Sequence, residues 1–331
     1  MNSFGRIFHI HIFGESHGEN LGVVIDGCPA GINLCAADFE SDLSRRRSGM
    51  RGTTSRRETD APSIVSGVYN EYTTGAPLAI LFSNNDTRSS DYEQFRTMPR
   101  PGHADFVAAK KWDNFNDPRG GGHFSGRITL ALTAAGVVAK KCIAPISVSA
   151  ELTEAGGSGA NIPETVNNAM SNRDSVGGII ECRAQHIPVG LGAPFFDTVE
   201  SLLAHILFAI PAVKGVEFGA GFAAARMTGS QHNDVFITSD GKTATNHAGG
   251  INGGITNGNE LFFRVAVKPT ASIACPQQTI NVQTNMIETL HVKGRHDACI
   301  ALRAPVVVEA AAAIVLCDLT LRRKADVITN V

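Results

Sequence analysis

The chain has 331 residues, of which 43% are hydrophobic and 18% charged, and its formal net charge is −2. This composition is too apolar for a disordered protein and allows a substantial buried core. The small net charge gives no general attraction to nucleic acid or to an anionic membrane. We therefore expect neither as a partner, and any anion site must depend on local arginine clusters.

Cysteine usage and apolar runs bear on where the protein works. The seven cysteines are odd in number, lie far apart and form no CxxC pair, which is typical of reduced thiols in a cytoplasmic protein. The first apolar run is interrupted by two histidines and Glu15, so it is a poor signal peptide. The longest apolar stretch, 304–316, contains Glu309 and is shorter than the roughly 20 residues that a membrane span needs. We predict a cytoplasmic protein with one domain over 1–331, because no linker or repeat divides the chain.

Taken in chain order, the elements begin with strands at 4–13 and 21–25, a hairpin with His17 at its mouth. A helix over 36–47 then runs into a basic segment that ends at Arg51. Beyond it, strands are expected at 63–68, 78–82, 146–152, 178–184 and 261–267, and helices at 128–141, 198–210 and 304–321. The helix at 128–141 is apolar around most of its circumference and should be central. Neighbouring antiparallel strands with few, long helices favour an α+β fold.

Three loop histidines have a carboxylate close by in the sequence: Glu15 with His17, His103 with Asp105, and His296 with Asp297. Imidazole is the only unperturbed side chain that both accepts and donates protons near neutral pH, which suggests proton transfer. Solvated loop histidines are the other interpretation, and the residues alone leave both open. A metal site is a third, but the spacing of the histidines gives it little support, and we predict no metal.

A cluster of six arginines can be interpreted in three ways: a nucleic-acid arm, a solvated face, or a pocket for a small molecule carrying phosphate or carboxylate groups. Its members are Arg45, Arg46, Arg47, Arg51, Arg56 and Arg57. Glu58 and Asp60 follow the cluster directly and no aromatic residue interrupts it, which favours a small anion for some of its members. Two glycine-rich loops, 117–127 and 246–258, match neither a P-loop nor the dinucleotide fingerprint. Such loops let the backbone approach a flat or charged ligand, so we interpret them as a cradle for a cofactor or substrate.

Seven motifs in this order, spread over nearly the whole chain, resemble chorismate synthase: 13–18, 45–51, 100–105, 119–127, 246–258, 268–272 and 294–299. The resemblance implies a carbon–oxygen lyase that converts 5-enolpyruvylshikimate 3-phosphate to chorismate and phosphate by anti-1,4-elimination, in the shikimate pathway. It implies reduced FMN as cofactor, with NADPH only as an indirect source of electrons. It also implies a single-domain β-α-β sandwich, with antiparallel four-stranded sheets enclosing helices, assembled as a homotetramer.

Site residues follow from the resemblance position by position. His17, His103 and Asp297 resemble the catalytic residues, with His17 beside the reduced flavin, His103 on the substrate side and Asp297 assisting proton removal. Arg46, Arg51 and Arg127 resemble residues that bind the substrate or NADP. The flavin contacts would be His123, Phe124, Ser125, Ala212, Gly253, Lys268, Pro269, Thr270, Ala271, Ser272 and Arg295.

The chain departs from the common family pattern at four places. His123 and Phe124 stand where an arginine and a serine are common, which puts their side-chain contacts in doubt. Pro211 replaces a frequent asparagine and weakens that flavin contact, whereas Ala271 and Ala298 are mild changes.

Two other functions stay open at this stage. One is a metal-dependent phosphohydrolase that uses His17, His103 and Asp297 as ligands. The other is a flavin-storage or RNA-binding protein without lyase activity. The sequence also does not say whether the protein reduces its own flavin or depends on a separate flavin reductase.

Overall fold

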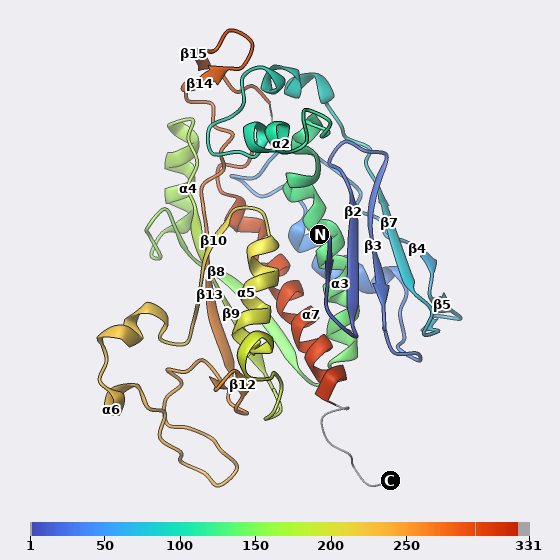
Figure 1. Ribbon diagram of the computed structural model, residues 1–331, viewed down its shortest axis with the longest axis vertical. Coiled ribbons are helices and arrows are strands. Elements are labelled where there is room, and N and C mark those ends of the chain that lie inside the picture. Colours follow the sequence, from blue (N-terminus) through green and yellow to red (C-terminus); the bar gives the residue numbers. More distant parts are fainter. Residues whose placement is uncertain (1, 295, 324–331) are drawn as a thin grey trace.

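The structure is a computed structural model that describes residues 2–294 and 296–323. Two antiparallel sheets form its frame (Figure 1). The first has the order β1-β2-β3-β7-β4, with bounds Ser3–Phe4, His9–Gly14, Asn20–Asp26, Leu78–Ser83 and Ser63–Ser66. The second has the order β10-β13-β9-β8, with bounds Val213–Phe218, Leu261–Val267, Gly178–Gln185 and Ser147–Ala155. Three two-stranded ribbons are peripheral: β5 with β6 (Val68–Tyr69, Tyr72–Thr73), β11 with β12 (Ile251–Asn252, Ile255–Thr256), and β14 with β15 (Gln277–Asn281, Met286–Leu290).

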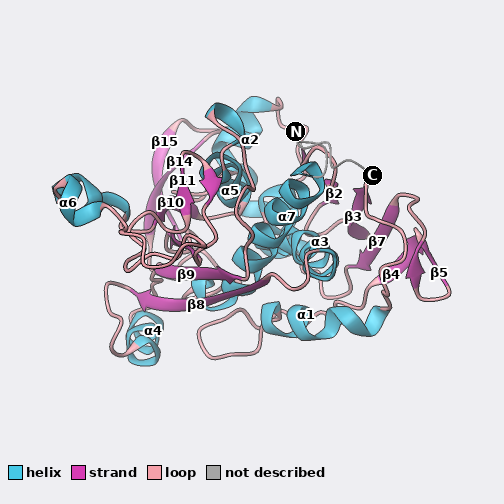
Figure 2. Ribbon diagram, turned by 90° about the horizontal axis from the view of Figure 1, so that it is seen from below, coloured by secondary structure: helices cyan, strands magenta, loops and turns pink. Residues whose placement is uncertain are grey.

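Two apolar helices lie side by side between the main sheets. Helix α3 (Thr129–Cys142) packs on α7 (Pro305–Arg323), and both views show the pair flanked by β3 on one side and by β8 and β9 on the other (Figures 1 and 2). Every residue of α3 from Leu130 to Ala139 is buried, as its apolar circumference predicts, because the helix meets another helix on one side and a sheet on the other. Helix α5 (Val199–Ala209) also contacts α7. This arrangement makes one continuous apolar core.

The remaining helices are short and peripheral. They are α1 (Glu40–Arg46), α2 (Asp105–Lys111), α4 (Ile162–Ser171) and α6 (Gly229–His232). Short 3₁₀-helices η1 to η7 lie at Ala36–Phe39, Ser89–Arg96, Arg119–Phe124, Gly126–Ile128, Phe195–Asp197, Gly221–Arg226 and Ile300–Arg303. Among the described residues, no helix is both long and apolar enough to cross a membrane.

The α+β prediction and most predicted elements are confirmed. The hairpin around His17 pairs His9 with Asp26 and Gly14 with Leu21, and the strand predicted at 261–267 has the bounds observed for β13. The single strand predicted at 4–13 is wrong, because the chain turns at Gly5, where φ is +94°, and β1 folds back onto β2. The sheets are antiparallel as expected, but the first has five strands rather than four, since this returning segment adds an edge strand.

Several elements end at the same end of the molecule. Helices α3 and α7 begin there, while β2, β13, α1 and α5 end there. The residues that follow or precede these ends line one cavity. The fold therefore brings segments from the whole length of the chain to one site.

Candidate functional site

The candidate site is a cavity of about 620 Å³ at this end of the fold. Its lining is strongly cationic although the chain carries a net negative charge. Three carboxylates, Glu58, Asp60 and Asp297, face eight cationic side chains: Arg46, Arg47, Arg56, Arg57, Arg100, Arg127, Lys268 and Arg303. A cleft lined by one sign of charge concentrates ligands of the opposite sign. The site therefore suits a small molecule with several negative charges.

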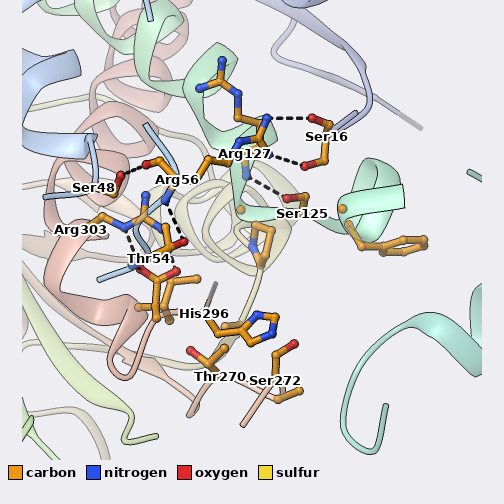
Figure 3. A pocket seen from close by; sticks show the side chains of 18 of the residues that line it. Ser16, Ser48, Thr54, Arg56, Ser125, Arg127, Thr270, Ser272, His296 and Arg303 are labelled. Carbon is orange, nitrogen blue, oxygen red and sulfur yellow. Dashed lines mark hydrogen bonds and ion pairs between the residues drawn. The ribbon is translucent and has the colours of Figure 1, made fainter. Parts of the chain in front are cut away.

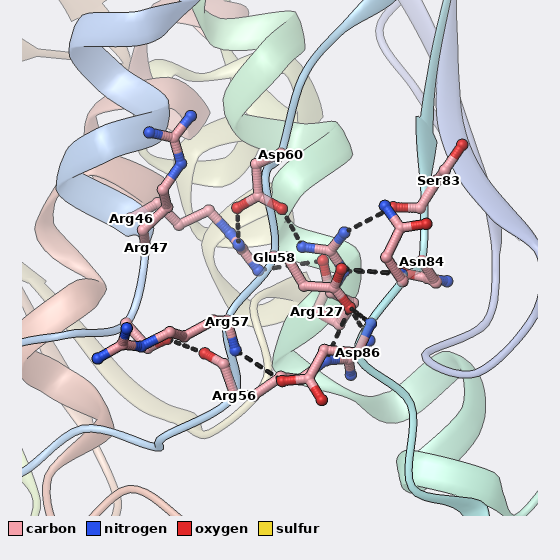
Figure 4. A network of polar contacts seen from close by, with 12 residues as sticks. Arg46, Arg47, Arg56, Arg57, Glu58, Asp60, Ser83, Asn84, Asp86 and Arg127 are labelled. Carbon is pink, nitrogen blue, oxygen red and sulfur yellow. Dashed lines mark hydrogen bonds and ion pairs between the residues drawn. The ribbon is translucent and has the colours of Figure 1, made fainter.

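Asp60 holds two of the predicted anion-binding arginines in place (Figure 4). It is 2% exposed, forms a close ion pair with Arg127, and lies 3.5 Å from Arg46 across an Oδ2–Nη1 pair. Arg46 also donates to the carbonyls of Gly126 and Arg127 at 2.8 and 3.1 Å. Burial lowers the pKa of Arg46 to about 9. Much of the hydrogen-bonding capacity of these two arginines is thus used inside the protein before any ligand binds.

Glu58 holds Arg56 in place, as Asp60 holds Arg46 and Arg127. The Glu58 carboxylate accepts from Arg56 Nη2 at 2.7 Å and from the backbone amides of Asn85 and Asp86. Burial opposes ionisation of Glu58, but these hydrogen bonds outweigh it, so its pKa is lowered. Arg56 in turn donates to Ser16 Oγ at 2.9 Å, which fixes the end of the β2–β3 hairpin beside the cavity (Figure 3). We call the five residues Arg46, Arg56, Glu58, Asp60 and Arg127 the anchored wall.

The first glycine-rich loop lies between the two predicted catalytic histidines. Three successive glycines, 120–122, have φ of +62°, +82° and +55°, which other residues rarely adopt. A Cβ atom on Gly120 would lie 2.5 Å from His17 Cδ2, and one on Gly121 would lie 3.5 Å from His103 Nε2. The glycines therefore let the loop approach both imidazoles.

His17 lies at the margin of the cavity and does not line it. Its side chain is 9% exposed, its Nδ1 is 3.0 Å from Ser89 Oγ, and its ring packs edge-on against Tyr92 at 5.2 Å. Ser16, Tyr92 and Gly120 around it do line the cavity. His17 is thus one side chain removed from the space that a ligand would fill.

His103 lines the cavity and is held by its own loop. Its Nδ1 is 2.6 Å from Asp105 Oδ1 and 3.1 Å from Arg100 Nη2. Because the carboxylate only accepts and is the nearer group, Nδ1–H donates to Asp105 and leaves Nε2 unprotonated in the neutral ring. Burial opposes ionisation of Asp105, but the hydrogen bonds from Arg100 and His103 outweigh it and lower its pKa. An ionised Asp105 therefore fixes both the tautomer and the orientation of His103.

Asp297 lines the cavity and is 9% exposed. Its partner is Arg303, which donates to it through Nε at 3.1 Å and Nη2 at 2.9 Å, and it also accepts from the Thr54 amide at 3.0 Å. The structure does not bring Asp297 together with His17 and His103 as ligands. Within residues 2–294 and 296–323, no cluster of three histidine, cysteine or carboxylate groups could hold a metal.

The segment Lys268 to Ser272, whose residues the resemblance implies as flavin contacts, lines the side of the cavity across from Ser16 and Arg127 (Figure 3). On this side of the cavity, some polar atoms have fewer hydrogen bonds within the protein than those of the anchored wall. Thr270 Oγ1 is buried and has no hydrogen-bond partner among the described residues. Burial and the nearby charge of Lys214 lower the pKa of Lys268. We call Lys268, Thr270, His103 and His296 the open wall.

A second cavity, of about 520 Å³, shares Phe124, Pro211, Ala212 and Lys268 with the first. Its walls are largely apolar side chains from β2, α3 and α5. His123 lines this second cavity and not the first, and its Nδ1 is 2.7 Å from the carbonyl of Gly14. The apolar patch at Phe124, the unpartnered Thr270 hydroxyl and the cation at Lys268 together fit a ligand with a flat ring system and an anionic tail, as FMN has.

The other predicted residues divide clearly. Ser125, Pro269, Ala271 and Ser272 line the main cavity. Gly253 lies in the β11–β12 turn with open space around it and lines neither cavity, and exposed Arg51 lines neither as well. Arg295 lies outside the described residues.

Sequence reasoning assigned no role to three polar residues that line the cavity: Tyr92, Arg100 and Arg303. Arg100 lies in the motif that was singled out for His103, and its guanidinium lies 4.3 Å from the Phe95 ring centre. His296, which the sequence pairs with Asp297 as a candidate for proton transfer, also lines the cavity. Tyr92 and Arg303 stand in segments whose pattern gives no signal, since only the fold brings them to the site.

Comparisons with known proteins agree on one family. A family model described as chorismate synthase matches residues 8–321. The chain is 60% identical over 322 residues to a chorismate synthase of Chitinophaga pinensis, with 97% of each protein covered. It is 46% identical over 352 residues to one of Dehalococcoides mccartyi, again with 97% of each covered. A crystal structure of chorismate synthase is similar with a TM-score of 0.74 and 26% identity, covering 96% of this chain and 93% of that one.

Proposed function

This chain belongs to the chorismate synthase family and converts 5-enolpyruvylshikimate 3-phosphate to chorismate and phosphate, and we propose that it does so in the cationic cavity with reduced FMN. The observation that carries the proposal is the excess of cationic over acidic side chains around the 620 Å³ cavity. The substrate carries one phosphate and two carboxylates, so it needs such an excess. Guanidinium groups recognise both kinds of anion through paired hydrogen bonds.

The anchored wall would position the substrate. Arg46 and Arg127 share the buried carboxylate of Asp60, so their guanidinium groups are already oriented when the ligand arrives. Preorganised charges stabilise charge that develops in a reaction without reorganising at that moment. Here charge develops on the departing phosphate. We infer that the arginines of this wall, Arg46, Arg56 and Arg127, face the anionic groups of the substrate.

The open wall would hold the cofactor and move the proton. When bound, reduced FMN supplies electron density that assists cleavage of the bond to phosphate. Thr270 has a buried hydroxyl free to contact it, and Lys268 supplies a cation beside the apolar patch. His103 presents Nε2 near Gly121, where it can hold a proton beside the ligand. His17, packed on Tyr92, would act from the margin of the cavity.

Asp297 as a proton acceptor rests on its place in the cavity lining. Its ion pair with Arg303 offers an alternative, because an acid that merely anchors a neighbour gives a similar arrangement. Asp297→Asn keeps the shape and can still accept from Thr54. A role as general base predicts retained binding of FMN and substrate with turnover lowered roughly 10²-fold. An anchoring role predicts turnover near that of the wild type, which anaerobic stopped-flow measurement of phosphate release would show.

The flavin site can be tested by binding alone. Thr270→Val keeps the side-chain shape and removes the unpartnered hydroxyl, so we expect the Kd for FMN to rise roughly five- to tenfold, the value of one hydrogen bond. Thr320→Val is the matched control, because Thr320 Oγ1 is also buried with no partner in the part of the chain that the structure describes, but lines neither cavity. Flavin fluorescence titration measures both. Equal affinity of the two variants would place the flavin elsewhere.

We also propose a single domain, a homotetramer and a cytoplasmic location. One continuous cluster of buried apolar residues, which spans both main sheets and the helices between them, supports a single domain. Apolar side chains that stand out from the surface support assembly, and they include Phe195, Phe196, Phe222 and Phe236 at 85%, 88%, 81% and 71% exposure. All seven cysteines are free thiols, which supports a reducing compartment. NADPH as electron source and a separate flavin reductase remain proposals.

A further inference from the structure

His296 combines two features that the proposed mechanism does not yet use. It lines the main cavity, and its ring lies beside Thr270 and Ser272 (Figure 3). Its Nε2 is 3.2 Å from the carbonyl oxygen of Lys293. A carbonyl oxygen only accepts, so Nε2 carries the proton and donates it to this hydrogen bond. In the neutral ring, Nδ1 is then an unprotonated acceptor.

The surroundings keep the ring neutral. Burial, together with the positive charge of Arg100, lowers the pKa of His296, while the hydrogen bond to the Lys293 carbonyl and the carboxylates of Asp297 and Asp91 oppose this effect without reversing it. Nδ1 has no hydrogen-bond partner among the described residues and is not enclosed by protein. It therefore stays available to a ligand at neutral pH.

Available acceptors are scarce in this cavity. The three lining carboxylates already accept from arginines: Glu58 from Arg56, Asp60 from Arg46 and Arg127, and Asp297 from Arg303. The hydroxyl oxygens of Ser16 and Ser272 accept from Arg56 and Arg100. Besides these groups, Nε2 of the neutral His103 ring is an acceptor. The lining is thus rich in donors for anions and offers few unoccupied side-chain acceptors for neutral N–H or O–H groups.

The ligands nevertheless carry such groups. 5-Enolpyruvylshikimate 3-phosphate keeps one free ring hydroxyl, because its other two are phosphorylated or carry the enolpyruvyl group. Reduced FMN has ring N–H groups that oxidised FMN lacks. A donor that is buried without an acceptor costs about 1–3 kcal/mol, so the site needs an acceptor for each.

We infer that His296 is a further ligand-binding residue, whose Nδ1 accepts a hydrogen bond from an uncharged donor, either the ring hydroxyl of the substrate or an N–H of reduced FMN. The inference rests on the proposed function, since it takes both ligands to occupy this cavity. In this inference His296 recognises a neutral donor group of the ligand, while the arginines bind its anionic groups. The backbone hydrogen bond to Lys293 sets the tautomer that makes this possible.

Two variants of similar size separate an acceptor from a space-filling ring. His296→Leu removes the acceptor, whereas His296→Asn places an amide oxygen close to the position of Nδ1. We expect the Leu variant to bind the ligand that carries the donor roughly five- to tenfold more weakly, and the Asn variant to recover most of that loss. Thermal unfolding of both variants identifies any loss that is due to misfolding.

Three titrations identify the donor. Substrate is titrated into each variant with oxidised FMN bound, and oxidised and reduced FMN are titrated separately under anaerobic conditions. Weaker substrate binding in the Leu variant assigns the ring hydroxyl, and a substrate analogue without that hydroxyl should then bind wild type and Leu variant equally. Weaker binding of reduced but not oxidised FMN assigns a flavin N–H.

Two results would overturn the inference. Unchanged affinities for all three ligands would show that Nδ1 contacts none of them. Equal losses in the Leu and Asn variants would show that the ring, or its bond to Lys293, matters instead of the acceptor. Failure of the proposed function is distinguishable, since wild-type protein would then bind no FMN at all.

Discussion

The anchored wall and the open wall of the cavity differ in how much of their polar capacity the protein itself consumes. Arg46 and Arg127 meet in the buried carboxylate of Asp60, whereas Thr270 Oγ1 and His296 Nδ1 have no partner among the described residues. Both walls face the same space. The protein itself already occupies the polar groups of the anchored wall. The open wall keeps polar groups that a ligand can pair with.

This difference indicates how a site for a polyanion can be both stable and selective. Several guanidinium groups close together repel one another, as the coulombic effect of Arg127, Arg56 and Arg303 on Arg46 shows. Internal carboxylates offset that repulsion and fix the geometry, at the expense of part of the positive charge. The open wall can then be specific for neutral groups. Substitutions in the two walls should therefore have different signatures, with stability affected in the first and binding or turnover in the second.

The largest effect is expected from the open wall. His103→Ala should lower turnover by roughly 10²- to 10⁴-fold, the usual contribution of a positioned acid–base group, and leave the fold intact. His17→Ala is expected to fall in the same range. His291→Ala is the control, since His291 is exposed and lines neither cavity. Steady-state phosphate release measures turnover, and circular dichroism measures folding. An unfolded His103 variant would show a structural role instead.

Next in size is the loss of Asp60 from the anchored wall. Asp60→Ala leaves two buried guanidinium groups without their carboxylate, so we expect the free energy of unfolding to fall by roughly 3–5 kcal/mol. Glu40→Ala is the matched control, because it also removes the carboxylate partner of an arginine, Arg47, but at the exposed surface. Its effect should be much smaller. Urea denaturation compares the two, and similar losses would contradict the proposed difference between buried and exposed pairs.

Arg46 and Arg51 belong to one motif, but their substitutions should differ in their effects on stability and on substrate affinity. Arg46→Lys loses the fork that contacts Thr129, Gly126 and Asp60, so we expect roughly 1–3 kcal/mol less stability and weaker substrate binding. Arg51→Lys changes an exposed residue that lines neither cavity, and it should stay within about 0.5 kcal/mol of wild type. Substrate titration with FMN present, together with urea denaturation, tests both. Equal responses would place Arg51 in the site after all.

The smallest effect concerns pH. The pKa of Asp105 is lowered in the folded protein, so its stabilising contribution is complete above the unfolded pKa near 4 and is lost as pH falls through the folded value. Asp105→Asn should therefore be less stable than wild type at pH 7, with the difference shrinking below about pH 4. Urea denaturation across this range measures it. A difference independent of pH would show that the Asp105 charge does not matter.

The sequence could predict most of the fold because its main elements have strong periodic signals. The buried helix at 128–141 and the strand at 261–267 are examples, whereas the return of β1 depends on one glycine turn. Site residues within glycine-rich or proline-rich motifs, such as His103 and Ser125, were also within reach. Arg303 and Tyr92 were not, because only tertiary packing brings them to the cavity. Nor could the sequence distinguish Arg46 from Arg51, since burial and the position of Asp60 make that difference.

The most direct test of the whole account is single-turnover phosphate release under anaerobic conditions. Wild-type protein is mixed with 5-enolpyruvylshikimate 3-phosphate and with reduced FMN, oxidised FMN or no flavin, and phosphate, chorismate and the flavin spectrum are followed together. We predict that phosphate and chorismate form in equal amounts only with reduced FMN, which is still reduced at the end. Equal rates without flavin, or phosphate without chorismate, would contradict the account and favour a phosphohydrolase.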